Sequence, residues 1–237
     1  MTEGVKRFTI DRYEKDEVLL SMGRRREFDV DEALDAALRV FWQKGYEGAS
    51  YTDLTQAIGV ERPALYSAFG NKEALFRQAL ERYYTRELAF FPAALKLPTS
   101  REVASHILHN AIELNTRDPE QSGCLAIHGA LAVSDDAEPV RQLLIEARAT
   151  AEATLRERFE QAKREGDLPK TADCAALASY ICAVTHGMAV QAKAGFSRER
   201  LDAVAAQALS NWPGSEHTAG KQEQDAHRGP GKIRRPK

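Results

Sequence analysis

Apolar residues recur at helical spacing along almost the whole chain between its two polar ends. Val103, Ile107, Leu108 and Ala111 are spaced four, one and three residues apart, which places them on one face of a helix. Comparable stripes occupy 34–45, 140–159, 177–188 and 201–212, each ended by glycine or proline. No segment alternates apolar and polar residues as a half-buried strand does. The sequence therefore predicts an all-α fold.

The stretch 50–72 predicts two short helices joined by a tight turn. One helix follows Ser50 and stops at Gly59, while the next carries Pro63 in its first turn, where a missing N–H costs nothing, and breaks at Gly70. Apolar side chains are expected to lock these helices at a fixed angle, and a small alanine should allow close approach. These side chains are Leu54, Ala57, Ile58, Val60, Leu65 and Phe69.

The outer face of the second short helix is left free to contact another molecule. It carries Arg62, Ala64, Tyr66 and Ser67. A rigid helix presented in this way can enter the major groove of DNA with its N-terminal residues at the base edges. The same periodicity also fits a helical hairpin inside an ordinary bundle. The formal net charge of −2 does not decide between them, because phosphate contacts need clustered cations on one surface.

Residues 28–80 resemble the DNA-binding domain of the TetR family of transcriptional regulators. The similarity begins with Phe41 and Gly45-Tyr46, and it continues through Thr52 and the Ile58-Gly59-Val60 turn. It is densest in the run Pro63-Ala64-Leu65-Tyr66-Ser67-Ala68-Phe69-Gly70-Asn71-Lys72-Glu73-Ala74-Leu75. The resemblance implies a helix-turn-helix module that reads double-stranded operator DNA, and it makes this interpretation the preferred one.

The resemblance also implies a role for individual side chains. Thr52 is expected to bond a DNA phosphate from the start of the second helix, and Tyr66 to reach the backbone through its hydroxyl. Lys72, at the N-terminus of a fourth helix, adds its charge to the helix dipole and free N–H groups. The residues expected to face the bases are Arg62, Pro63, Ala64 and Ser67, with Arg62 the candidate for a bidentate guanine contact.

Composition and resemblance together divide the chain into four parts. We expect a flexible N-terminal extension (1–26), a helix-turn-helix domain (27–80), a helical ligand-binding and dimerisation domain (81–212) and a disordered basic tail (213–237). The residues Gly23-Arg24-Arg25-Arg26-Glu27-Phe28 resemble the usual N-terminus of family members, and they directly follow Met22. A further hypothesis is therefore that translation starts at Met22 instead of Met1.

By the same resemblance, the last two long helices should pair with those of a second copy to form a homodimer. They are predicted at about 171–194 and 198–212. Two-fold operators need two recognition helices, which also favours a dimer. The alanines expected to allow close packing across the interface are Ala175, Ala178, Ala205 and Ala208.

The ligand of the second domain cannot be named from the sequence. Cys124 and His128 lie four residues apart and hence on one helical face, and with His186 they are candidates to line a pocket for a small-molecule inducer. Metal binding by these residues and sensing of an electrophile by Cys124 are further interpretations of the same pattern. A buried cysteine and two partly buried histidines in the core would give the same pattern. Neither a metal nor a cofactor is predicted, because the three cysteines show no CxxC spacing.

The predicted protein is therefore a ligand-responsive, sequence-specific DNA-binding regulator of the cytoplasm, not an enzyme and not a membrane protein. We expect a repressor that an inducer releases from its operator. A repressor that needs no ligand remains an alternative. An enzyme using Cys124 as nucleophile and His128 as base is a second alternative, but it leaves the stretch 50–72 unexplained.

Overall fold

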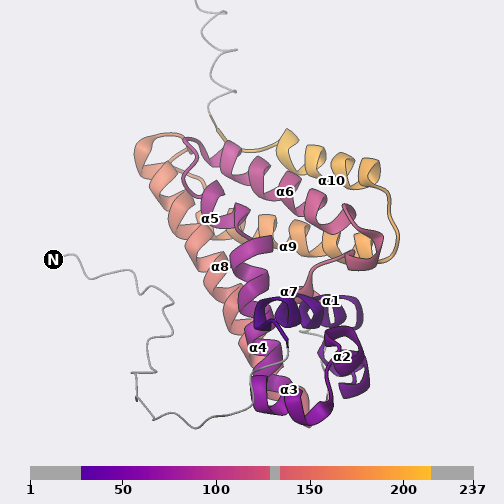
Figure 1. Cartoon of the computed structure of the whole chain (residues 1–237). Coiled ribbons are helices and arrows are strands. Elements are labelled where there is room, and N and C mark those ends of the chain that lie inside the picture. Colours follow the sequence, from indigo (N-terminus) through magenta and orange to yellow (C-terminus); the bar gives the residue numbers. More distant parts are fainter. Residues whose placement is uncertain (1–27, 129–133, 215–237) are drawn as a thin grey trace, which may run out of the picture.

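The computed structural model describes residues 28–128 and 134–214, and every regular element in these two ranges is a helix (Figure 1). The all-α prediction is thus confirmed. The predicted N-terminal extension, the alternative start at Met22 and the tail beyond Gly214 lie outside the described residues.

The N-terminal helices are bounded by the local signals that the sequence carries. They are α1 (Val30–Gly48), α2 (Tyr51–Ile58), α3 (Arg62–Phe69) and α4 (Lys72–Arg82). Gly45 takes φ 71° and ψ 177°, so the helical backbone of α1 is interrupted at the residue where the sequence predicts its end. A further short turn then continues the helix to Gly48. Ser50 and Asp53 form a reciprocal capping box at the start of α2, and Gly59 ends it in the left-handed conformation.

The remaining helices build the larger part of the molecule. They are the π-helical turn η1 (Tyr83–Glu87), α5 (Phe90–Ala94), α6 (Ser100–Thr116), the 3₁₀ turn η2 (Pro119–Gln121), α7 (Leu125–His128), the 3₁₀ turn η4 (Asp135–Ala137), α8 (Glu138–Glu165), α9 (Cys174–Lys193) and α10 (Arg198–Ser210). In Figure 1, α8 runs along one side of the molecule, α6, α9 and α10 gather at one end, and α2 and α3 form the opposite end.

Two hydrophobic cores hold these helices together. The first contains the buried faces of α1 to α4 and also Leu114, Leu125 and Leu144 from α6, α7 and α8. The second joins α5, α6, α8, α9 and α10 around side chains such as Phe159 and Trp212. Because α6, α7 and α8 contribute to the first core, the N-terminal helices are packed against the second domain and not merely tethered to it.

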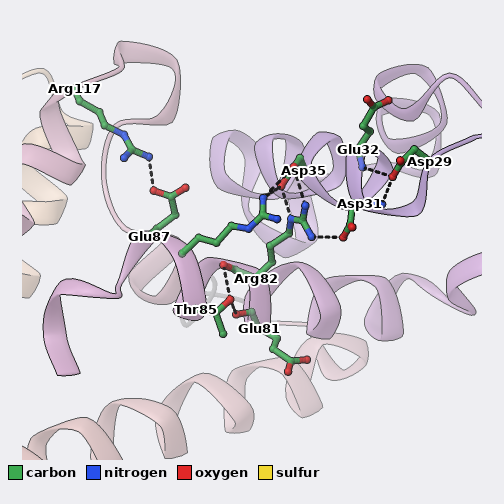
Figure 2. Close-up of polar contacts among 10 residues, drawn as sticks. Asp29, Asp31, Glu32, Asp35, Glu81, Arg82, Thr85, Glu87 and Arg117 are labelled. Carbon is green, nitrogen blue, oxygen red and sulfur yellow. Dashed lines mark hydrogen bonds and ion pairs between the residues drawn. The ribbon is translucent and has the colours of Figure 1, made fainter. Parts of the chain in front are cut away.

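A polar clamp fixes the end of α4 to α1 (Figure 2). The guanidinium of Arg82, whose side chain is only 11% exposed, donates to Asp31 at 2.7 Å and to both carboxylate oxygens of Asp35. Arg86 donates to Asp35 as well, at 3.1 Å. The Thr85 hydroxyl donates to the backbone carbonyls of Glu81 and Arg82, where the helix widens into η1.

Replacing Arg82 with glutamine is expected to lower the free energy of unfolding by about 1–2 kcal/mol at neutral pH, because it leaves Asp35 without its main partner. Arg82 holds the pKa of Asp35 below its ordinary value of 3.8. A carboxyl with a depressed pKa in the folded state stabilises the fold above its unfolded pKa and loses this contribution as pH falls through the folded value. The loss should therefore persist down to about pH 4 and shrink below it.

Urea denaturation across this pH range measures the difference. Arg86→Gln serves as the control, since the Arg86 side chain is 54% exposed and contacts the same carboxylate. It should cost less than about 0.5 kcal/mol. An Arg82→Gln loss of the same size at every pH would contradict the assigned ion pair.

The helix α9 has more apolar surface than its own chain covers. By length and composition it is the one helix among the described residues that could cross a membrane, and only 28% of its most apolar window is buried within the chain. Polar residues such as Ser179 and His186 interrupt this helix, so it contains no continuous apolar run. In the fold, α9 packs against α6, α7, α8 and α10, while Tyr180 and Val190 on this helix stay exposed.

The alanines of the last two helices do not lie where the sequence analysis placed them. Ala178, Ala205 and Ala208 are buried against the chain's own helices, while Ala175 is exposed. The prediction that the first three pack across a dimer interface is therefore wrong. Small residues permit close packing within one chain as readily as between two, and periodicity alone does not separate these cases.

Candidate functional site

The two short helices α2 and α3 form a rigid unit at the end of the molecule opposite α10 (Figure 1). Leu54 of α2 and Leu65 and Phe69 of α3 are buried in the first core. Ala57, expected at the close approach of the helices, is instead exposed. The large side chains, and not the small one, set the angle between α2 and α3.

The residues predicted to contact DNA lie on this unit and are mostly accessible. Thr52, Arg62, Pro63, Tyr66 and Ser67 are exposed. The two half-buried members are Ala64 and Lys72. Pro63 lies in the first turn of α3, as expected. Their accessibility fits the predicted roles, which remain predictions.

An aromatic cluster that the sequence analysis missed organises this surface. The ring of Tyr51, at the start of α2, stacks on the ring of Tyr66 with centroids 5.2 Å apart. The guanidinium carbon of Arg62 lies 4.2 Å from the centroid of the Tyr51 ring, and an Arg62 N–H donates to the Tyr66 hydroxyl at 3.3 Å. The Tyr51 hydroxyl accepts from the backbone N–H of Lys72 at 3.1 Å.

Lys72 occupies the position at the start of α4 that the resemblance implies. Its backbone lies in the first turn, after the Asn71 cap, and its ammonium nitrogen lies 4.7 Å from the centroid of the Tyr46 ring. Partial burial lowers the pKa of Lys72. Hydrogen bonding to Tyr51, and then to Arg62, lowers the pKa of Tyr66. The surface therefore offers cationic groups, which suit a phosphate backbone, whereas the Lys72 backbone N–H is already bonded to Tyr51 and is not free as the resemblance implied.

The candidate ligand residue Cys124 is half-buried and packs against the first core. Its sulfur accepts a hydrogen bond from the hydroxyl of the buried Tyr83, at 3.2 Å. Burial raises the pKa of the Cys124 thiol. A thiol with a raised pKa is a poor nucleophile, so the local chemistry opposes a catalytic role for this cysteine. His128 ends α7, and its side chain lies outside the described residues.

Cys124 directly precedes α7, which packs against α8 and against α9, the helix of His186. His186 is half-buried on α9, and burial, reinforced by the charge of Arg148, lowers its pKa. Arg148 of α8 also donates to the carbonyl of Ala126, at 3.3 Å. The Tyr84 hydroxyl is buried without a hydrogen-bond partner among the described residues. Tyr84 and Arg148, which the sequence analysis did not identify, interact electrostatically with Cys124 and His186, respectively.

Comparison with known proteins places both parts of the chain. Residues 33–79 match the family described as bacterial regulatory proteins of the tetR family, and residues 105–208 match the tetracyclin repressor-like C-terminal domain. The HTH-type transcriptional repressor ComR of Escherichia coli is 35% identical over 196 residues, which cover 81% of this chain and 93% of ComR. The repressor BdcR of the same organism is 30% identical and covers 78% of this chain and 90% of BdcR.

A solved structure of similar sequence extends the comparison to three dimensions. The TetR family regulator CifR, as a cysteine mutant complexed with 26 bp double-strand operator DNA, has a TM-score of 0.77 and 40% sequence identity. The match covers 80% of this chain and all of the CifR chain. The chain therefore belongs to the TetR family and is a DNA-binding transcriptional regulator of that type.

Proposed function

We propose that this protein is a cytoplasmic homodimeric repressor that binds operator DNA through α3 and is released from it by a small-molecule inducer. The observation that carries the proposal is the recognition surface. Helix α3 lies at one end of the molecule (Figure 1) and is held to the first core by the buried Leu65 and Phe69. Its Arg62, Tyr66 and Ser67 are exposed to solvent. The repressor activity of ComR and BdcR supports the sign of the regulation.

The roles of the DNA-facing residues follow from their positions. Thr52 and Tyr66 are proposed to bond phosphates, and Lys72 to add charge at the N-terminus of α4. Arg62 and Ser67 are proposed to reach base edges. Pro63 and Ala64, which carry no polar side-chain atoms, bring the backbone of α3 close to the groove.

The dimer is proposed to form through the uncovered faces of α9 and α10. Among the described residues, the exposed large hydrophobic side chains outside the DNA-binding surface are Tyr180 (44%), Val190 (51%) and Val204 (37%). All three lie on these two helices. A two-fold pair of α3 helices about 34 Å apart would fit two half-sites one turn of DNA apart.

The inducer is proposed to bind near Cys124, His128 and His186, with Arg148 and Tyr84 as additional contacts. Tyr83 is in contact both with Cys124 and, through its ring, with Trp42 of α1, where the centroids are 4.8 Å apart. A ligand that moves this region can therefore shift α1 and α4. It must favour the released arrangement by a few kcal/mol to act as a useful switch. Catalysis is not proposed, because burial raises the pKa of the Cys124 thiol and so disfavours the thiolate nucleophile.

Fluorescence anisotropy on an operator selected from randomised duplexes tests the proposal. The protein should bind this duplex about a thousandfold or more tighter than a scrambled one at physiological salt. Tyr66→Ala should weaken operator binding at least about tenfold by removing the proposed phosphate contact together with the ring that stacks on Tyr51, whereas Tyr66→Phe keeps the ring and should lose less. Equal, weak binding to both duplexes would count against a sequence-specific repressor.

A further inference from the structure

Tyr51 contacts three separate parts of the DNA-facing surface. Its ring stacks on that of Tyr66, with an angle of 27° between the ring planes. The same ring carries the guanidinium of Arg62 at 4.2 Å, while its hydroxyl accepts from the Lys72 backbone N–H at 3.1 Å. Tyr51 itself is half-buried and packs against the first core, so the core fixes the position of the ring that these groups contact.

Each contact restrains a group that would otherwise have several positions. Tyr66 is 38% exposed, and stacking limits the rotation of a ring that has few other neighbours to hold it. Arg62 is a long, exposed side chain, and its contact with two tyrosine rings, at 4.2 and 5.5 Å, gives it a defined resting place. The bond to Lys72 ties the first turn of α4 to the first turn of α2.

We propose that Tyr51 is a positioning residue for operator recognition, which sets the arrangement of Tyr66, Arg62 and the start of α4 before DNA binds. This inference rests on the proposed function, because it concerns the same surface. Groups that are already placed lose less conformational entropy on binding. The benefit is confined to the operator, whose contacts require one arrangement. Non-specific binding depends mainly on charge, which Tyr51 does not carry.

Tyr51→Leu is expected to weaken operator binding at least about tenfold while changing the affinity for scrambled duplex by less than about twofold. Tyr51→Phe retains the ring and should lose only the hydrogen bonds of its hydroxyl to Lys72 and Tyr66, a change of about fivefold or less. In a background of Tyr66→Ala and Arg62→Ala, the Tyr51→Leu change should cost about fivefold or less, because only the bond to the Lys72 backbone N–H is then left to lose.

Ile58→Ala is the matched control for stability. Ile58 lies on the same helix and packs against the same core without belonging to the tyrosine cluster. Thermal unfolding compares the variants, and Ile58→Ala should leave the ratio of operator to scrambled affinity unchanged. An equal fall in this ratio for Ile58→Ala, or an unchanged ratio for Tyr51→Leu, would overturn the positioning role. Absence of operator preference in the unmodified protein would instead refute the proposed function.

Discussion

An arginine in place of Val190 is expected to leave the protein monomeric at micromolar concentration and to weaken operator binding at least about a hundredfold. Val190 is 51% exposed on α9, amid apolar surface that the chain itself leaves uncovered. A charge there would have to be desolvated without a partner on forming the dimer. A monomer holds one recognition helix and can contact only one half-site of the operator. The expected hundredfold loss of affinity corresponds to about 2.7 kcal/mol of binding free energy.

Sedimentation and anisotropy measure the two effects on the same samples. His109→Arg is the control, because His109 is exposed on α6 and the substitution also places an arginine on the surface. It should leave both mass and operator affinity unchanged. A Val190→Arg protein that stays dimeric and binds as well as the unmodified protein would move the interface away from this part of α9.

Trp42→Ala is expected to reduce the free energy of unfolding by about 4 kcal/mol, a large share of the roughly 5–15 kcal/mol typical of a folded protein. The indole is fully buried, packs edge-on against Tyr83, and donates to the carbonyl of Gly123 at 2.6 Å. Alanine would leave a cavity and an unpaired buried carbonyl. Trp42→Phe fills most of the space and should cost about half as much.

Urea denaturation gives both values. The midpoint should fall with little change in the slope, because the surface exposed on unfolding is nearly the same. A loss below about 1 kcal/mol for Trp42→Ala would show that the contact between α1 and the loop before α7 adds little to the fold. A loss in Trp42→Phe equal to that in Trp42→Ala would instead assign the whole effect to the hydrogen bond.

The local signals of the recognition unit were sufficient to predict it. Ser50, Gly59, Pro63 and Gly70 each act on the backbone within a few residues, so their effect is visible in the sequence. The fold class followed from helical periodicity for the same reason. These features, together with the family resemblance, led to the α2–α3 unit and to the residues on its outer face.

The parts that the sequence did not predict depend on contacts between distant residues. Tyr51 joins the site only because α2 and α3 cross at an angle that brings its ring onto Tyr66. Arg148 approaches the Cys124 region only because α8 packs beside α7. The π-helical turn η1 was not predicted because its buried Tyr83 follows Ala79 and Leu80 at the spacing of an ordinary α-helix. Likewise, periodicity did not distinguish alanines buried within one chain from those that face a partner.

The two tryptophans of the chain lie one in each core, which makes the protein its own optical reporter. Trp42 is packed against Tyr83 and close to Arg117, whereas Trp212 packs on Phe159 and donates to the Ser100 hydroxyl. A Trp212→Phe protein would emit only from the junction between α1 and α7, and Trp42→Phe only from the second core. In ligand screening, the tryptophan fluorescence of each variant would then report, without an attached dye, whether a compound disturbs the contact between α1 and α7 or the second core.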